Sequence, residues 1–192
     1  ALELCDREML DTILYVQNLP NALGELYGFF LHQIKMQVME SRQAIPVPGS
    51  SPGETLYLPA WPGVYQPLLA ILSVALEPLS PNQLRAYGGI NANLNYIDEA
   101  LGHLHQFMDD VSGRYRLYHA TLSEFLTATS TNANPQNWDL YQDPIECHRK
   151  IVGYYRDQVG GWTADGWSRL DSYGWRHLLA HAKAADAPDL PA

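Results

Sequence analysis

The sequence has few cysteines, few cations and no long apolar run, and each scarcity excludes a class of protein. Cys5 and Cys147 are the only cysteines among 192 residues, too few for a disulfide framework, so a reducing cytosol is the expected compartment. A formal net charge of −9 opposes attraction to nucleic acid phosphates. The apolar stretch 68–76 is too short to cross a bilayer, and the first residues do not resemble a signal peptide. We therefore expect a cytoplasmic protein that binds neither nucleic acid nor a membrane.

Nucleotide-binding motifs are also missing. The sequence has no Gly-x-x-x-x-Gly-Lys-Ser/Thr loop to hold a triphosphate and no Gly-x-Gly-x-x-Gly fingerprint. Hydrophobic residues make up 46%, which is a globular composition. We expect a folded, non-enzymatic segment without a cofactor of its own, taken from a longer protein.

The N-terminal third divides into a helical segment and a linker. Within residues 1–40 a first helix is expected over 2–16, and a second follows an apolar spacing of three and four residues: Leu23, Leu26, Tyr27, Phe30, Leu31 and Ile34. Residues 41–62 are rich in Pro and Gly, which excludes a regular helix or a central strand. We expect a linker there, whose apolar second half packs along a neighbouring domain.

Residues 63–129 have the pattern of a winged helix, that is, three helices and a β-hairpin. The first helix, over 65–77, is apolar on nearly all sides, and the second is short and capped by Ser80 before Pro81. The third carries an apolar stripe from Leu94 to Met108. Turn residues at 109–113 then lead into a strand at 114–119.

Residues 130–192 are expected to be a helical region that leads toward a repeat domain. We expect an ordered loop over 129–144, a helix from Ile145 that Gly160 and Gly161 end, and a last helix that frays after His181. The predicted fold class is therefore mainly α: a helical segment, a winged helix and a C-terminal helical region.

His119 lies where the predicted strand gives way to a helix. Thr121 and Glu124 have the spacing of a capping box, which would start the helix there. Free N–H groups and the positive end of the helix dipole gather at such a start, so an outward-facing imidazole can help to hold an anion. The alternative is that the ring packs beside Leu117 and bonds a carbonyl.

Other candidate side chains have weaker patterns. His177 and His181 share a helix face at a spacing that can bind zinc, but Leu178 replaces the glutamate of His-Glu-x-x-His and no third ligand is evident. The late aromatic residues could form a cofactor box, although large aromatics at helical spacing are more typical of a core or an interface. They are Tyr154, Tyr155, Trp162, Trp167, Tyr173 and Trp175.

A winged helix raises the question of DNA binding. The third helix, which reads the major groove in DNA-binding members, has Asn95, Asp98 and Glu99 and neither Lys nor Arg before Arg114. Such a helix repels phosphates. The pattern favours protein contacts over DNA.

Several stretches, taken in order, resemble the region that follows the ATPase core in STAND signalling ATPases, most closely the NACHT branch. Residues 19–27 are similar to the Leu-Pro-x-x-Leu-x-x-x-Tyr helix that closes the ATPase lid in those proteins. Residues 65–80, 115–126 and 147–152 are similar to their winged helix and the helix after it. Residues 173–181 look like the start of their repeat region.

This resemblance implies a switch. In that family the winged helix folds back on the ATPase in the resting state, and a histidine of a Met-His-Asp-type triplet contacts the β-phosphate of ADP. That position falls on His119, although Tyr118 and Ala120 replace the flanking residues of the triplet. The implied partners are an upstream ATPase domain that binds ADP or ATP, a downstream repeat domain, and further copies in an active homo-oligomer.

Two other functions are compatible with the residues. The chain could be an adaptor module whose Trp and Tyr surfaces bind another protein, with His119 merely structural. A transcription regulator is the third alternative, and salt-sensitive binding to duplex DNA would support it.

Overall fold

The computed structural model describes residues 23–40, 44–48, 55–162 and 167–186. These residues form a mainly helical structure with two small antiparallel sheets, which confirms the expected fold class. The helix expected over residues 2–16 lies outside the described residues.

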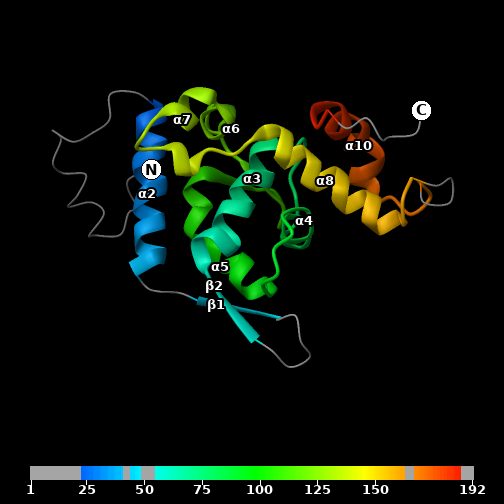
Figure 1. Cartoon of the computed structure of the whole chain (residues 1–192), viewed down its shortest axis with the longest axis horizontal. Coiled ribbons are helices and arrows are strands. Elements are labelled where there is room, and N and C mark those ends of the chain that lie inside the picture. The colour runs from blue at the N-terminus through cyan, green and yellow to red at the C-terminus, as the bar shows by residue number, and fades with distance from the viewer. Residues whose placement is uncertain (1–22, 41–43, 49–54, 163–166, 187–192) are drawn as a thin grey trace.

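The first described helix, α2 (Leu23–Glu40), follows the predicted apolar spacing. Its buried residues include Tyr27, Leu31, Ile34 and Val38, which recur at steps of three and four and share one face. Figure 1 shows α2 as the blue helix along one side of the molecule, next to α6. This helix therefore contributes one face to the core.

The described residues of the expected linker, 44–48 and 55–62, contain regular secondary structure. β1 (Ala44–Pro48) pairs antiparallel with β2 (Thr55–Pro59) in a separate two-stranded sheet. Prolines fit this hairpin because both strands are edge strands, where a proline nitrogen can face away from the ladder. Trp61 is 4% exposed, so the end of the segment packs on the body as expected, but Tyr57 on β2 is 68% exposed.

The first helix of the winged helix runs through the middle of the core. It begins as one π-helical turn, η3 (Trp61–Tyr65), and continues as α3 (Gln66–Val74), in which six of nine residues are buried. The predicted end at Glu77 is three residues too late, because Ala75 already has extended backbone. The N–H of Leu76 instead donates a hydrogen bond to the Tyr173 hydroxyl.

The next two helices confirm most of the prediction. Ser80 caps α4 (Pro81–Tyr87) in a reciprocal capping box with Gln83, and Pro81 occupies the first turn. α5 (Leu94–Leu104) buries its predicted apolar stripe. Met108 does not belong to that helix, because a 3-10 turn, η4 (His105–Phe107), ends it and Met108 begins a strand.

Three short extended segments complete the winged helix. β3 (Met108–Asp110) and β4 (Tyr115–Leu117) form the hairpin, and Leu79, between α3 and α4, exchanges two backbone hydrogen bonds with Tyr115. The chain order is therefore helix, strand, helix, helix, strand, strand. This is the topology of a winged helix.

The C-terminal region contains α6 (Ala120–Thr127), α7 (Thr129–Ala133), the 3-10 turn η5 (Trp138–Leu140), α8 (Pro144–Val159) and α10 (Ser172–Ala184). Residues 129–144, which were expected to form a loop, thus contain two helical turns. Backbone hydrogen bonds to the carbonyl groups of Ala128 and Asn134 close these turns. Gly160, with a φ of +71°, ends α8 as predicted. For residues 182–186 the predicted fraying is wrong, because α10 continues to Ala184 and Ala182 and Ala185 are buried; residues 187–192 lie outside the described residues.

A single hydrophobic core joins these parts. Buried residues of α2, the winged helix, α8 and α10 form one continuous cluster. The three boundaries between the four predicted segments remain predictions, and the buried cluster is continuous across them. Within the described ranges no helix is both long enough and apolar enough to cross a bilayer.

Candidate functional site

His119 occupies the N-cap position of α6, two residues after the end of β4. Its backbone is extended, with φ −115° and ψ 130°, and its side chain is exposed and makes no capping hydrogen bond. The ring contacts the ring of Tyr118 edge to face, with centroids 4.3 Å apart. Leu117 is buried while His119 faces outward, so the alternative of a ring packed in the core beside Leu117 is wrong.

The predicted capping box of α6 does not form. The hydroxyl oxygen of Thr121 lies 2.8 Å from the hydroxyl oxygen of Tyr27 on α2, and the N-cap residue is His119 rather than Thr121. The Thr121 hydroxyl, which the local spacing predicted to cap the helix, therefore bonds Tyr27, a residue 94 positions away in the chain.

Packing against α2 fixes the orientation of α6. The rings of Tyr27 and Phe125 have centroids 6.0 Å apart, and a Cβ added to Gly24 would lie 3.3 Å from the Phe125 ring. Leu122 and Leu126 of the same helix are buried. The helix is therefore held on the body while its first residue faces outward.

This arrangement can bind an anion. The first N–H groups of an α-helix have no intrahelical acceptor, and the aligned peptide dipoles place positive potential there. An exposed imidazole at the N-cap adds a hydrogen-bond donor, which carries a positive charge when it is protonated. A phosphate oxygen is a group that such a helix end accepts.

The histidines that suggested zinc make other bonds. His181 is fully buried, with Nε2 2.8 Å from the Tyr173 hydroxyl oxygen and Nδ1 2.7 Å from Nδ1 of His148 on α8. Nε2 of His177 lies 3.3 Å from a carboxylate oxygen of Glu77. Both ring nitrogens of His181 are thus engaged, and among the described residues no group of three or more His, Cys, Asp and Glu side chains is placed to hold a metal ion.

Burial changes the protonation of this histidine pair. Desolvation, with further contributions from His148 and His177, lowers the pKa of His181 to about 4. Desolvation also lowers the pKa of His148. The pair is therefore neutral at neutral pH, and one imidazole donates its N–H to the other.

Of the late aromatic residues, Tyr155 and Tyr173 are part of the core, whereas Trp175 is exposed. Tyr87, Tyr155 and Tyr173 are buried against one another, with ring centroids 5.5 and 5.6 Å from Tyr87. The Tyr155 hydroxyl donates to Asp171 at 2.7 Å and therefore accepts from the Tyr87 hydroxyl. Sequence reasoning missed this hydrogen-bonded chain because its members come from α4, α8 and the cap of α10.

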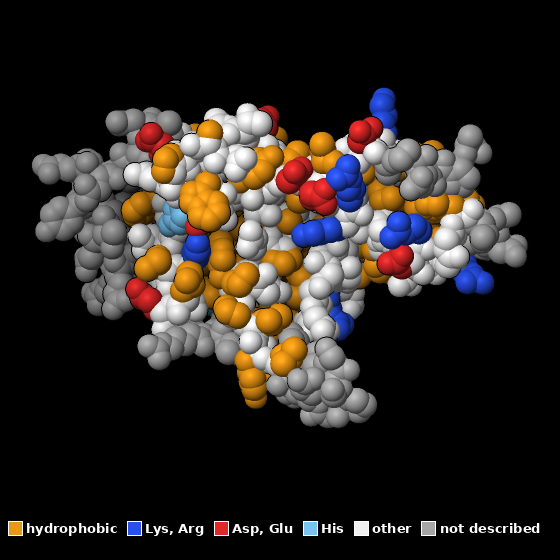
Figure 2. All heavy atoms as spheres, in the orientation of Figure 1, with side chains coloured by type: hydrophobic (Ala, Val, Ile, Leu, Met, Phe, Trp, Pro, Cys, Tyr) orange, Lys and Arg blue, Asp and Glu red, His pale blue; other side chains and the backbone are white. Residues whose placement is uncertain are grey.

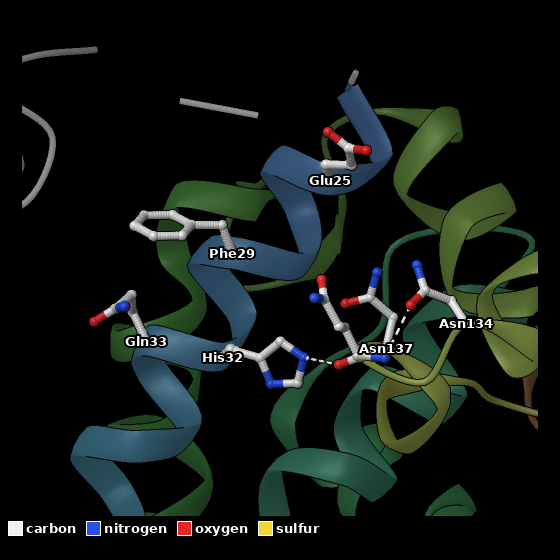
Figure 3. A pocket seen from close by; sticks show the side chains of 7 residues that line it. Glu25, Phe29, His32, Gln33, Asn134 and Asn137 are labelled. Carbon is white, nitrogen blue, oxygen red and sulfur yellow. Dashed lines mark hydrogen bonds between the residues drawn. The ribbon is translucent and has the colours of Figure 1, made fainter. Parts of the chain in front are cut away.

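A polar cavity beside α2 was also missed. It has a volume of about 470 Å³ and is lined by Glu25, Phe29, His32, Gln33, Asn134, Gln136 and Asn137. Figure 3 shows His32 pointing from α2 toward the segment of Asn134 and Asn137, where its Nε2 lies 2.6 Å from the carbonyl oxygen of Gln136. The lining offers amides, one carboxylate and one imidazole, so it can bind polar groups of a ligand.

Sequence reasoning also overlooked the pattern Gly-x-Ser-x-Gly at residues 49–53. In hydrolases this pattern forms a nucleophile elbow between a strand and a helix. Here it falls between β1 and β2, which are two strands of a hairpin, and residues 49–54 lie outside the described residues. The strand-to-helix context of a nucleophile is therefore missing.

Comparisons with protein-family models, with curated proteins and with solved structures found no match.

Proposed function

We propose that this chain is the non-catalytic switch segment of a STAND-type signalling ATPase of the NACHT branch. In this proposal the winged helix holds a closed, ADP-bound form, and exchange of ADP for ATP releases it and permits oligomerisation. The observation that carries the proposal is the exposed His119 at the N-cap of α6. Imidazole and helix N-terminus can face one phosphate oxygen together there.

The contact between α2 and α6 supports the same proposal. Tyr27 is the last residue of the stretch that resembles the lid-closing helix, and its hydroxyl bonds Thr121, two residues after His119. The stretch that resembles the lid-closing helix and the stretch that contains His119 therefore meet at the start of α6. A lid helix docked at this point would keep His119 in a fixed position relative to a nucleotide.

The charge on α5 supports a role other than DNA reading. The third helix of the winged helix exposes Asp98 and Glu99, whose carboxylates would repel a phosphate backbone. A winged helix with an acidic third helix is suited to contacts with protein.

The mechanism is a shift between two populations. ADP stabilises the closed form only to the extent that it binds this form more tightly than the open one. A hydrogen bond from His119 to the β-phosphate would exist in the closed form alone, so it supplies such a difference. A charged hydrogen bond of this kind contributes about 1.5–3 kcal/mol.

The test uses the parent protein, with the ATPase core joined to this chain. We expect His119→Leu to accelerate release of a fluorescent ADP analogue about tenfold or more, which corresponds to about 1.4 kcal/mol, and to increase assembly. The matched control is His105→Leu, because His105 is exposed at the end of α5 and bonds only the local carbonyl of Gly102. An unchanged ADP release rate in His119→Leu would reject the sensor role.

A second candidate function is an adaptor that binds another protein. Trp138 and Trp175 are each 62% exposed, and Leu179, one turn after Trp175 on α10, is 67% exposed. Large exposed aromatics of this kind are enriched in protein interfaces. For this function, Trp175→Ala would abolish binding to the partner while His119→Leu would leave it unchanged.

A further inference from the structure

The prolines of the β1–β2 hairpin determine which backbone groups face outward. In an antiparallel pair, opposed residues alternate between pairs that exchange hydrogen bonds and pairs that do not. Pro46 is opposed to Tyr57 and Pro59 to Ala44, and a proline has no N–H to exchange. Both pairs are therefore of the second kind, and the N–H and C=O of Tyr57 point away from β1.

The two edges of this small sheet consequently differ. On β1 the outward positions include Pro46 and Pro48, neither of which has an N–H, so this edge cannot complete a ladder with another strand. On β2 the outward groups are the N–H and C=O of Thr55 and Tyr57 and the C=O of Pro59. Among the described residues, no backbone hydrogen bond from a loop, turn or cap reaches Thr55 or Tyr57.

The side chains of Leu56, Tyr57, Leu58 and Pro59 on β2 are exposed and uncharged. Tyr57 is 68% exposed on one face of the strand, and Leu56 and Leu58 are 44% and 41% exposed on the other. Figure 2 shows hydrophobic side chains at the edge of the molecule where Figure 1 places the hairpin. Residues 44–48 and 55–59 contain no charged residue, although the chain carries a net charge of −9. A second copy would meet no like charge at this edge.

We propose that the outer edge of β2 pairs antiparallel with β2 of a second copy of this chain. A two-fold axis through Tyr57 gives a self-complementary register. Tyr57 exchanges two hydrogen bonds with Tyr57 of the second copy, and each Thr55 N–H donates to the opposed Pro59 carbonyl. Leu56 then lies opposite Leu58 of the second copy, so four leucines form a shared apolar contact on one face. This proposal is independent of the nucleotide switch proposed above.

The first test removes the outward backbone N–H of residue 57. We expect sedimentation equilibrium of the 192-residue chain to show a weak dimer, with a Kd on the order of 100 µM, because four backbone hydrogen bonds and a small apolar area form. Tyr57→Pro deletes the outward N–H without breaking a bond to β1, and it should raise the Kd at least about tenfold. Tyr57→Thr keeps the N–H and serves as the matched control, which should still dimerise.

The second test examines the register by charge exchange. Leu56→Lys alone and Leu58→Glu alone should each weaken the dimer, because each places one charge opposite a leucine. In the double variant the introduced ammonium lies opposite the introduced carboxylate of the second copy, so the dimer should recover. No other register of the two strands pairs both charges in this way.

Three results would overturn the proposal. One is a wild-type chain that stays monomeric at ten times the expected Kd. Another is a dimer that Tyr57→Pro leaves unchanged, which would place the contact elsewhere on the surface. The last is loss of the dimer in the charge-exchanged double variant. Circular dichroism of each variant, compared with wild type, ensures that a lost dimer is not a lost fold.

Discussion

The Tyr173 hydroxyl oxygen lies 2.8 Å from Nε2 of His181, and both side chains are buried where α10 packs on α8. The hydroxyl accepts from the N–H of Leu76 and has its own hydrogen left to donate to a neutral imidazole. With Nε2 as acceptor, His181 carries its hydrogen on Nδ1 and can donate it to His148. A protonated His181 would have no acceptor nitrogen for the hydroxyl hydrogen.

Stability should therefore decrease at mildly acidic pH. The pKa of His181 is about 4 in the folded chain and about 6.5 when unfolded, so the unfolded state binds the proton more readily. Its contribution is present above about pH 6.5 and is lost as the pH falls toward 4, at a cost of about 2–3 kcal/mol. Urea denaturation at pH 7 and pH 5 measures this difference. His105→Gln, which removes an exposed histidine, should retain it, whereas His181→Gln should reduce it.

Tyr155→Phe should destabilise the chain by about 1–3 kcal/mol. The variant leaves the Tyr87 hydroxyl without its buried acceptor and removes a donor to Asp171. Tyr154→Phe is the matched control, because Tyr154 packs edge to face on Tyr87 but makes no side-chain hydrogen bond with another described residue. Thermal unfolding of the two variants compares them directly. Equal losses would mean that packing rather than the hydroxyl chain stabilises this region.

Two glycine substitutions should change the unfolding free energy in opposite directions. A Cβ at Gly174 would lie 2.8 Å from the buried Tyr155 ring, so Gly174→Ala should lower the unfolding free energy by about 1–3 kcal/mol. Gly102, on the exposed side of α5, has no atom within 4 Å of the same position. Gly102→Ala should therefore raise the unfolding free energy by about 0.5–1 kcal/mol. Chemical denaturation of both variants distinguishes the cases.

Tyr27→Phe should weaken the attachment of α2 to α6. The substitution keeps the ring against Phe125 and removes only the hydrogen bond to Thr121, so we expect a loss of about 1 kcal/mol. Hydrogen exchange should increase in α2 before it increases in α3. If α2 and α3 exchange together in this variant, the two helices open as one unit and the bond to Thr121 does not control α2.

Local patterns predicted the helices well and distant partners poorly. The stripe of α5, the Ser80 cap of α4 and the Gly160 end of α8 depend on residues within a few positions, so sequence reasoning found them. The Thr121 capping box failed because α2 supplies a competing partner for the hydroxyl. No spacing in the sequence reports such a partner.

The hairpin and the candidate site illustrate the same limit. Prolines at 46, 48 and 59 argued correctly against a central strand, but they are compatible with a sheet that consists of edges alone. The position of His119 at a strand-to-helix junction was predictable, because alternating apolar and polar residues before it give way to apolar residues at helical spacing after it. Its exposure depends on how α6 packs on α2, and that packing follows from the whole core.

The hydrogen-bonded chain from Tyr87 through Tyr155 to Asp171 has a mechanical consequence. It attaches the winged helix to α8 and to the cap of α10, so these parts rotate together. α8 has 16 residues and is about 24 Å long at 1.5 Å per residue. A rotation of about 10° around its N-terminal end would displace its far end by about 4 Å, a simple lever relation based on that length. A small turn of the winged helix is thereby amplified at the C-terminal end of the molecule.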